Sequence, residues 1–464
     1  MQQGFLKNRT GAAVEQAAID GLRERFAGIL IHPHDPGYDS ARRIWNASID
    51  KNPGLIAMCS GTADVIHAVD FARSNDVLVA VRSGGHNVAG RALCDDGIVI
   101  DLSAMKGIIV DPQAGTVCVQ AGVTLGQLDR ETAVHGLAVP TGVAPPTGIA
   151  GLTLGGGVGW LTRKYGMTCD SLLSCEVVTA TGGVVTASAA SNPDLFWGLR
   201  GGGGNFGIVT SLLFRAHPVA TVLGGLLLYP RDQAAAVLRH YRDAMASAPN
   251  ELTAYAGLIC TPDGTPVTGI MVCYCGELEE GERVLHPLRS FGPPMLDMVQ
   301  PLPFVEMQKL AYQQGELETR NYWRSTFLKE LSDAAIDLIV EHANMAASPL
   351  TGTIVQVLGG AASLPAGDDT AYAPRRELYN IGIEARWIDA TENAGHVDWA
   401  RNFARALERY SSRAYMLNFL SDEGPEAIRD AFGANHARLV ALKRKYDPEN
   451  FFRLNQNIDP QGLA

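Results

Sequence analysis

The sequence is poor in charge and has no long apolar run. Charged residues make up 19% of it, and 49 aspartates and glutamates outnumber 38 lysines and arginines, for a formal net charge of −11. This deficit of positive charge argues against a surface that binds nucleic acid or an anionic membrane. No stretch is long and apolar enough to span a membrane. We therefore expect neither a nucleic acid nor a membrane among its partners.

Paired cysteines are also missing. The chain has eight cysteines, and none of them stands in a Cys-x-x-Cys pair. We interpret them as reduced, mostly buried thiols of a cytoplasmic protein. His32 and His34 could suggest a metal pair, but they lie in a proline-interrupted loop without further ligands. The sequence predicts no metal site.

Glycine, in contrast, is abundant. The 464 residues include 50 glycines, which gather in three clusters and indicate binding lined by backbone rather than flexible linkers. The hydrophobic content of 46% is typical of a soluble globular enzyme and too high for disorder. A chain of this length predicts two domains.

A predicted strand over residues 77–81 runs into the first cluster. The cluster reads Arg82-Ser83-Gly84-Gly85-His86-Asn87. Its two glycines allow positive φ and let backbone N–H groups approach a bound group closely. Arg82 adds forked donors suited to a pyrophosphate, and His86 projects from the turn, where it can reach a ligand. For this stretch alone, a tight turn with a chance histidine is an equal alternative.

The second cluster, residues 140–160, is too irregular for collagen and too apolar for a linker. We predict an extended wall of free amides that cradles a phosphate or a ring edge, with plain turns between strands as the alternative.

The third cluster, residues 201–207, formally matches G-x-G-x-x-G. A Rossmann motif follows a strand and opens a helix. This stretch follows a helical segment and opens a strand at 208–214, so we reject a classical Rossmann site.

The composition and residue pattern of the sequence change near residue 220. The glycine clusters stop, and strand-like runs alternate with amphipathic helices, which predicts a second α+β domain with a mostly antiparallel sheet. One of its expected strands covers residues 413–420. The last stretch places Asn455, Gln456 and Asn457 after an aromatic pair, which suits a segment that packs back onto a cofactor pocket.

Three pieces in order carry a resemblance. They are Arg82-Ser83-Gly84-Gly85-His86-Asn87, Gly155-Gly156-Gly157-Val158-Gly159, and the terminal Tyr446-Asp447-Pro448-Glu449-Asn450-Phe451-Phe452-Arg453 followed by Asn455-Gln456-Asn457. As a set they resemble the berberine-bridge-enzyme-like group of FAD-linked oxidases, which have the vanillyl-alcohol-oxidase fold, and most closely its bacterial single-histidine members. The likeness covers nearly the whole chain.

The resemblance implies an α+β fold with a discontinuous first domain. A PCMH-type FAD-binding domain of two α/β subdomains would occupy residues 1–220, with its core at about 50–220. A substrate-binding α+β domain with an antiparallel sheet would follow at 221–430. Residues 431–464 would return to the FAD domain.

The resemblance also implies FAD bonded covalently through His86 to the flavin 8α-methyl carbon. Many relatives have a second bond from a cysteine, but the matching residue here is Ala144, so one link is expected. We expect the cofactor to be bound by Arg82, Ser83, Gly84, Gly85, His86, Asn87, Gly142, Thr147, Gly148, Gly151, Gly155, Gly156, Gly157, Gly207, Val209, Asn455 and Asn457.

The implied reaction is hydride transfer from a small secondary metabolite, of aromatic alkaloid or polyketide type, to flavin N5, with molecular oxygen as acceptor. A sugar or alcohol oxidase of the same fold and a flavin-binding relative without turnover are alternatives. A Rossmann dehydrogenase built on residues 202–207 is the alternative from another class, but no NAD site is visible in the sequence, which favours an oxidase.

Three residues are candidates for the catalytic base. Tyr415 stands in a Tyr-x-x-Asn variant of the family's Tyr-x-Asn motif, and Arg413 on the same expected strand could lower its pKa of about 10. Glu384 and Tyr372 are weaker candidates. For Glu384, the nearby Arg386 favours a structural salt bridge. Tyr312, Tyr322 and Trp323 could line an aromatic pocket or belong to the core.

Overall fold

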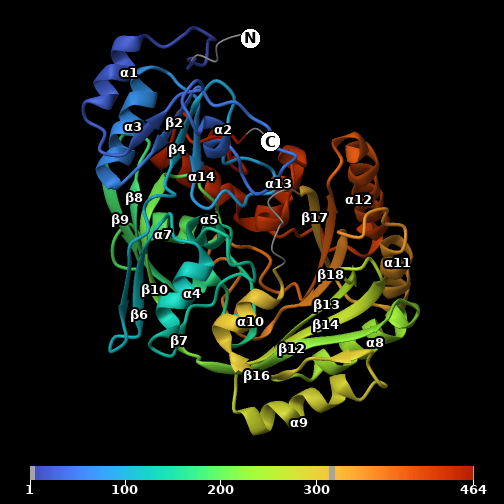
Figure 1. Ribbon diagram of the computed structural model, residues 1–464. Coiled ribbons are helices and arrows are strands. Elements are labelled where there is room, and N and C mark those ends of the chain that lie inside the picture. Colours follow the sequence, from blue (N-terminus) through green and yellow to red (C-terminus); the bar gives the residue numbers. More distant parts are fainter. Residues whose placement is uncertain (1–5, 313–318, 463–464) are drawn as a thin grey trace.

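A mixed sheet and an antiparallel sheet form the first lobe of the computed structural model, which describes residues 6–312 and 319–462 (Figure 1). The mixed sheet has the order β1-β2-β4-β3 and contains β1 (Ile29–Ile31), β2 (Leu55–Met58), β3 (Val79–Arg82) and β4 (Ile98–Asp101). The antiparallel sheet has the order β5-β6-β10-β8-β9 and contains β5 (Ile108–Asp111), β6 (Thr116–Gln120), β8 (Leu172–Val178), β9 (Val184–Ser188) and β10 (Ile208–Arg215).

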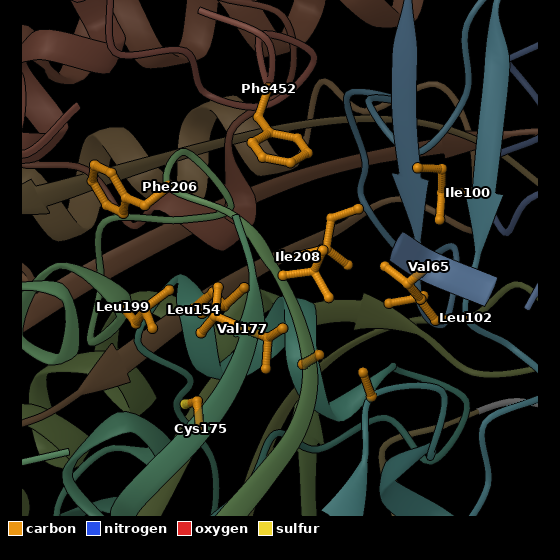
Figure 2. Close-up of a cluster of buried hydrophobic side chains, with 14 of the residues drawn as sticks. Val65, Ile100, Leu102, Leu154, Cys175, Val177, Leu199, Phe206, Ile208 and Phe452 are labelled. Carbon is orange, nitrogen blue, oxygen red and sulfur yellow. The ribbon is translucent and has the colours of Figure 1, made fainter. Parts of the chain in front are cut away.

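The core of this lobe joins its two sheets. Strand β4 pairs in parallel with β2 and β3 and is buried along its whole length, as its continuous apolar run predicts. Helix α3 (Thr62–Ser74) connects β2 to β3 and turns Val65 and Val69 toward the strands. Figure 2 shows Val65 and Ile100 in the same cluster as Ile208 of the second sheet.

The helices of the first lobe are short. They are α1 (Gln16–Arg23), α2 (Tyr38–Ala41), α4 (Leu125–Ala133), α5 (Ile149–Leu154), α6 (Thr162–Tyr165) and α7 (Pro193–Leu199), with a 3-10 turn at Thr168–Asp170. A capping box between Thr124 and Gln127 begins α4, and Gly136 follows its end with φ at 66°. A small ribbon of β7 (Leu137–Ala138) and β11 (His217–Pro218) precedes the second lobe.

A large antiparallel sheet dominates the second lobe. Its order is β15-β12-β14-β13-β18-β19-β17, and β16 also pairs with β12. The strands are β12 (Thr221–Pro230), β13 (Leu252–Cys260), β14 (Pro266–Tyr274), β15 (Leu296–Asp297), β16 (Gln300–Pro303), β17 (Arg320–Leu328), β18 (Gly352–Val357) and β19 (Tyr379–Trp387).

Helices cover the outer face of this sheet. Helices α8 (Ala234–Ala246), α11 (Asp333–Ala343) and α12 (Asn393–Leu407) pack there, on the right in Figure 1, and bury a separate core. Helices α9 (Leu278–Arg289) and α10 (Phe304–Leu310) lie near the β12 edge. The inner face meets the first lobe, and Phe304 and Met307 of α10 pack on it beside Val222 and Cys273.

The last part of the chain returns to the first lobe. After α13 (Gly424–Phe432), helix α14 (His436–Tyr446) packs against α7, and Phe452 and Ile458 join the first core. This arrangement confirms the expected α+β fold class. The boundaries near residues 220 and 430 remain our proposed division of the chain.

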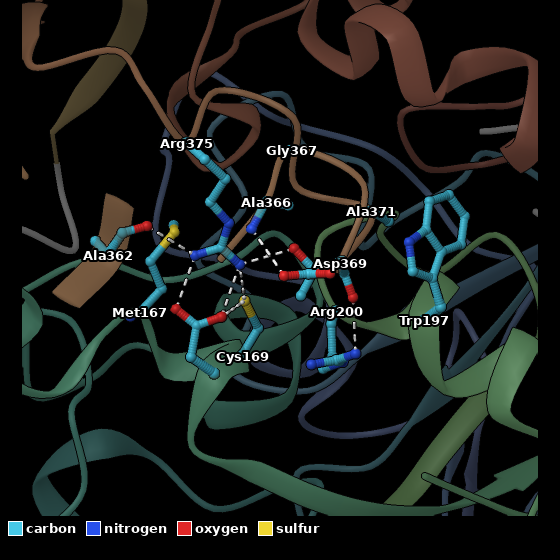
Figure 3. A network of polar contacts seen from close by, with 12 residues as sticks. Met167, Cys169, Trp197, Arg200, Ala362, Ala366, Gly367, Asp369, Ala371 and Arg375 are labelled. Atoms are coloured by element: carbon cyan, nitrogen blue, oxygen red, sulfur yellow. Dashed lines mark hydrogen bonds and ion pairs between the residues drawn. The ribbon is translucent and has the colours of Figure 1, made fainter. Parts of the chain in front are cut away.

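A buried ion pair ties the segment before β19 to the first lobe (Figure 3). The Arg375 guanidinium, whose side chain is fully buried, donates to both carboxylate oxygens of Asp170 at 2.7 Å. Nearby, Arg200 donates to the Asp369 carbonyl at 2.9 Å. Such bidentate pairs set orientation as well as distance, so residues 362–375 are held firmly against the first lobe.

The structure corrects two expectations about secondary structure and adds one strand that was not expected. The second glycine cluster is not an extended wall throughout, because residues 149–154 form α5. Residues 413–420 form no strand: Arg413 has φ at 63°, and Leu417–Phe419 is a 3-10 turn. Strand β17 escaped the sequence analysis because polar residues alternate with its apolar ones on both faces.

Candidate active site

A cavity of about 810 Å³ lies between the first lobe and the inner face of the large sheet. Its first-lobe wall includes Ser83, Gly84, Gly85, His86, Asn87, Gly142, Ala144, Thr147, Gly148, Gly151, Gly155, Gly203, Gly204, Gly207 and Val209. The sheet supplies Tyr255, Gly257, Ile259, Gly269, Met271, Trp323, Ile354, Gln356, Glu384 and Arg386. The glycine clusters thus face a wall of side chains.

His86 lies on the first-lobe wall, and its Nε2 atom is the feature of interest. Its Nε2 is buried and has no hydrogen-bond partner among the described residues. Burial, with a smaller contribution from the charge of Arg386, lowers the pKa of His86 to about 4. The imidazole is therefore neutral at physiological pH. One ring face stacks on Trp45 with the ring centroids 4.2 Å apart.

Close backbone contacts explain two of the glycines. A Cβ on Gly148 would collide with the backbone of Gly84 and with the Ser83 hydroxyl, and a Cβ on Gly84 would collide with Gly148. These residues bring the first and second clusters into direct contact beneath the cavity. Similarly, a Cβ on Gly155 would collide with Asn418, whose side-chain amide donates to the Leu152 carbonyl at 3.1 Å.

The returning C-terminal segment holds the third cluster in place. Lys443, fully buried on α14, donates from Nζ to the Asn205 carbonyl (2.8 Å), the Asp447 carboxylate (2.7 Å) and the Phe452 carbonyl (2.8 Å). The Asp447 carboxylate also accepts from the backbone N–H groups of Phe451 and Phe452. We refer to Lys443, Asp447 and Asn205 as the C-terminal clamp.

Most of the expected cofactor residues lie on the cavity. Ser83, Gly84, Gly85, His86, Asn87, Gly142, Thr147, Gly148, Gly151, Gly155, Gly207, Val209 and Asn455 line it. Gly156, Gly157 and Asn457 are not among the lining residues. Gly156 and Gly157 have φ values of 107° and 79° and shape the turn after α5, and the buried Oδ1 of Asn457 has no partner among the described residues.

Arg82 differs from its expected role. Its guanidinium forms an ion pair with the buried Asp101, its register partner on β4, and donates to the Ala41 and Arg43 carbonyls. Because alternate strand residues point to opposite faces, Arg82 turns away while Val81 lines the cavity. Arg82 therefore supports the strand end that carries the turn and does not offer donors to the cavity.

The sheet wall has a flat floor. Gly257 on β13 stands directly opposite Gly269 on β14, and both line the cavity. A cross-strand glycine pair leaves bare backbone where other pairs place side chains. The residues around this floor are mainly apolar or aromatic, among them Tyr255 and Met271. The side chains of Ile354, Ile259 and Leu226 lie beside the two glycines, so this part of the wall is an apolar surface.

Gln356 brings an oriented amide to this wall. Its Oε1 accepts from Asn380 Nδ2 at 2.8 Å, and Asn380 Oδ1 accepts from the Ser325 hydroxyl at 2.6 Å. The Met416 backbone N–H donates to the same hydroxyl. With the Gln356 oxygen occupied, its amide nitrogen is the group left to donate toward the cavity. Sequence reasoning did not single out Gln356, because the relay joins three strands and a loop.

Of the three candidate bases, only Glu384 lines the cavity. It accepts from Arg386 at 2.7 Å, and the Arg386 guanidinium lies 5.2 Å from the Trp323 ring centroid. Glu384 therefore belongs to a salt bridge, as the sequence suggested, and also lines the cavity.

Tyr415 and Tyr372 lie elsewhere. Burial raises the pKa of Tyr415, with Arg413 only a minor opposing influence, and the tyrosine packs against the first core rather than the cavity. Burial likewise raises the pKa of Tyr372, which sits under Gly156 and Gly201 with Arg375 over its ring. Both environments favour the neutral phenol, which is opposite to what a base near neutrality requires.

The aromatic candidates divide by strand alternation. Trp323 and Tyr312 line the cavity, whereas Tyr322, one residue from Trp323 on β17, points to the other face and donates to Glu423 at 2.6 Å. Trp45 also escaped the sequence analysis, since nothing in its neighbourhood marks it as a partner of His86.

The site fits FAD. The buried Nε2 of His86 and the Oδ1 of Asn455 have no partners among the described residues, and glycines leave backbone open along one wall. A flavin dinucleotide needs this combination of bare backbone for phosphates and ring edges with a few polar groups for orientation.

Comparisons with known proteins agree. The FAD binding domain family matches residues 53–188, and the berberine and berberine-like family matches residues 414–459. An FAD-linked oxidoreductase of Dictyostelium discoideum is 33% identical over 95% of this chain and 97% of its own length. The (R)-6-hydroxynicotine oxidase of Paenarthrobacter nicotinovorans is 32% identical over 94% of this chain and 97% of that protein.

Solved structures give the same result. The crystal structure of 6-hydroxy-D-nicotine oxidase from Arthrobacter nicotinovorans matches with a TM-score of 0.85 and 31% identity, covering 94% of this chain and 98% of that chain. A chitooligosaccharide oxidase shares the fold, with a TM-score of 0.85 and 23% identity.

Fold, cavity and relatives together define the class of FAD-dependent oxidoreductases with a PCMH-type FAD-binding domain. Within that class, the chain belongs to the berberine-bridge-enzyme-like family of FAD-linked oxidoreductases, which are enzymes. The resemblance inferred from the three motifs is confirmed. Among the described residues, no helix has both the length and the apolar character needed to cross a membrane.

Proposed function

We propose that this enzyme is an oxidase whose FAD is bonded covalently through His86 alone. One observation carries the proposal: a neutral imidazole on the cavity wall has its Nε2 buried without a partner. A buried polar atom without a partner costs free energy, so its retention is explained if the atom bonds to the cofactor. Ala144 lines the same cavity and offers no sulfur for a second link.

When bound, FAD would accept a hydride at N5 from a substrate carbon and pass the electrons to molecular oxygen. The chain's own residues would position the reactants. The three glycine clusters would hold the cofactor through backbone contacts, and the sheet wall would place the substrate over the floor formed by Gly257 and Gly269. Glu384 would take the proton from a substrate O–H or N–H, since it is the one expected base on the cavity.

The substrate we propose is a small aromatic secondary metabolite. The glycine pair with Tyr255 and Met271 beside it, and Trp323 farther along the same wall, suits an aromatic substrate. Gln356 would donate to an acceptor atom of that substrate. The likeness to an (R)-6-hydroxynicotine oxidase supports the same class. A sugar would require more hydrogen-bonding side chains than this largely apolar wall presents. We place the reaction in the cytoplasm, where the free thiols of the chain would stay reduced.

Acid precipitation tests the covalent link. Purified wild-type protein should keep its yellow colour in the acid pellet, and His86→Ala should release it. Release of all colour from the wild type would refute the covalent assignment while leaving a flavoprotein.

Oxygen consumption with a panel of hydroxylated aromatic amines and sugars tests the reaction. We expect turnover with an aromatic member, peroxide as product, and a fall in kcat of about 100-fold or more in Glu384→Gln. Preferential oxidation of the sugars would favour the alternative of a sugar oxidase.

A further inference from the structure

The stacked ring beneath His86 has a role that packing alone does not explain. Trp45 is 3% exposed, and its ring lies nearly parallel to the imidazole, at an interplanar angle of 17°. His86 follows Gly84 and Gly85, and Gly85 has φ at 68°. Neither glycine has a side chain that could pack against the imidazole. The stack with Trp45 is the ring contact that sets the plane of the imidazole.

The backbone around Trp45 is itself anchored on both sides of the cavity. Its N–H donates to the Gly85 carbonyl at 3.2 Å, within the His86 turn. The next residue, Asn46, donates to the Val88 carbonyl (2.7 Å) and to the Asn321 carbonyl at the start of β17 (2.9 Å). Residues 45–46 therefore connect the turn that carries His86 to the second lobe.

The other edge of Trp45 meets the substrate wall. Trp323 packs against it edge to face, with the centroids 4.9 Å apart at an angle of 74°. The Arg386 guanidinium covers the Trp323 ring. The Trp45 ring is packed on one face by the imidazole and on its edge by Trp323, so it has little freedom to rotate. The imidazole stacked on it therefore keeps one orientation.

We propose that Trp45 is the positioning residue for covalent attachment of FAD, because it holds the His86 ring in the plane from which Nε2 bonds to the cofactor. This inference rests on the histidyl link proposed above. In that step a bond from Nε2 to the 8α carbon replaces one methyl C–H bond and the imidazole N–H bond. The two protons and two electrons released end on molecular oxygen as hydrogen peroxide.

The test separates attachment from folding. Wild type, Trp45→Leu, Trp45→Phe and Trp387→Leu are purified with FAD, and two quantities are measured: total flavin per protein and the fraction that precipitates with acid. Trp387 is the matched control, since it is a buried tryptophan stacked on His396 with centroids 4.9 Å apart, in the second lobe. The Trp387→Leu variant shows how much total flavin and acid-stable flavin are lost when any buried, stacked tryptophan is removed.

We expect Trp45→Leu to keep total flavin within twofold of wild type and to lose at least about 10-fold in the acid-stable fraction, which corresponds to about 1.4 kcal/mol of orientation. Trp45→Phe, which keeps a ring face, and Trp387→Leu should retain most of the acid-stable flavin. An acid-stable fraction in Trp45→Leu equal to that of the wild type would overturn the proposed role of Trp45 and leave the histidyl link in place.

Other outcomes are equally decisive. If Trp45→Leu does not fold, Trp45→Phe and Trp45→Met replace it: a higher acid-stable fraction in the phenylalanine variant supports the proposal, and equal fractions overturn it. Complete release of colour from the wild type would overturn the histidyl link and this inference together.

Discussion

The two walls of the cavity are built on different principles. The first-lobe wall is mostly backbone, contributed by three glycine clusters and closed by the C-terminal clamp. The opposite wall is mostly side chains from strands of one antiparallel sheet. A common cofactor suits the first wall, because its contacts require the absence of side chains. The second wall can change its substrate by single substitutions without loss of the cofactor site.

The first wall should therefore be intolerant of change and the second tolerant. Four variants test this contrast, in order of decreasing expected effect.

The largest effect is expected from Lys443→Met. The substitution leaves Asp447 charged and fully buried without its partner, and breaking a buried pair in this way costs about 3–5 kcal/mol. The free energy of unfolding from denaturant titration should fall by that amount, with loss of bound flavin. Lys445→Met is the control, since that lysine is exposed and pairs with Asp194 at the surface. Equal losses in both variants would contradict the clamp.

Gly148→Ala should cost about 2–3 kcal/mol, because the new Cβ overlaps the Gly84 backbone. Gly151→Ala, three residues later in α5, meets no atom within 4 Å and should keep or raise the free energy of unfolding. Thermal unfolding of the two cofactor-free proteins measures the difference. Similar stability in both would show that close contact between the first two clusters is not required.

The titration of His86 should change the free energy of unfolding by about 2–3 kcal/mol. In the folded cofactor-free protein its pKa is about 4, against 6.5 when unfolded. Between these values the unfolded state binds more protons, so lowering the pH from 6.5 to 4 favours unfolding, and above 6.5 the contribution is constant. Denaturant titrations of wild type and His86→Phe isolate this contribution, because His217, whose pKa burial also lowers to about 4, is present in both. Parallel curves would argue against a buried neutral imidazole.

The smallest effect is expected on the substrate wall. Gln356→Leu removes one donor and should raise KM about 5-fold, or about 1 kcal/mol, with flavin content near that of wild type. Ile354→Val on the same strand and face is the control and should change KM less than 2-fold. A loss of bound flavin in Gln356→Leu would break the proposed division between the walls.

The contrast between the walls also explains what the sequence could predict. Three features of the first wall are contiguous in the sequence: the turn at His86, the glycine clusters and the C-terminal motif. Their residue types therefore predict a binding site, and the resemblance to the family, with its fold, follows from them. The strand that ends at Arg82 was also recognised. Because side chains alternate between the two faces of a strand, Arg82 points away from the cavity and pairs with Asp101.

The substrate wall could not be predicted in this way. The Gly257–Gly269 floor and the Gln356–Asn380–Ser325 relay depend on which strands are neighbours and in what register, and β17 was not recognised at all. Tyr415 was favoured because of a motif, yet the segment folds as a turn with Arg413 at positive φ. Pairing between distant strands decides these positions, and no local pattern reports it.

The C-terminal clamp has a consequence for the order of events during synthesis. Asn205 lies more than 200 residues before the lysine that holds its carbonyl, and the side chain of Asn205 accepts from the Ile458 backbone N–H. While the ribosome is still translating the large sheet, the loop at residues 201–207 has none of these partners. The nascent chain can fold its early strands, but it completes the cradle only after residues 443–458 have emerged from the exit tunnel. We therefore expect flavin capture to follow translation, and a chain that stalls before this point to be colourless.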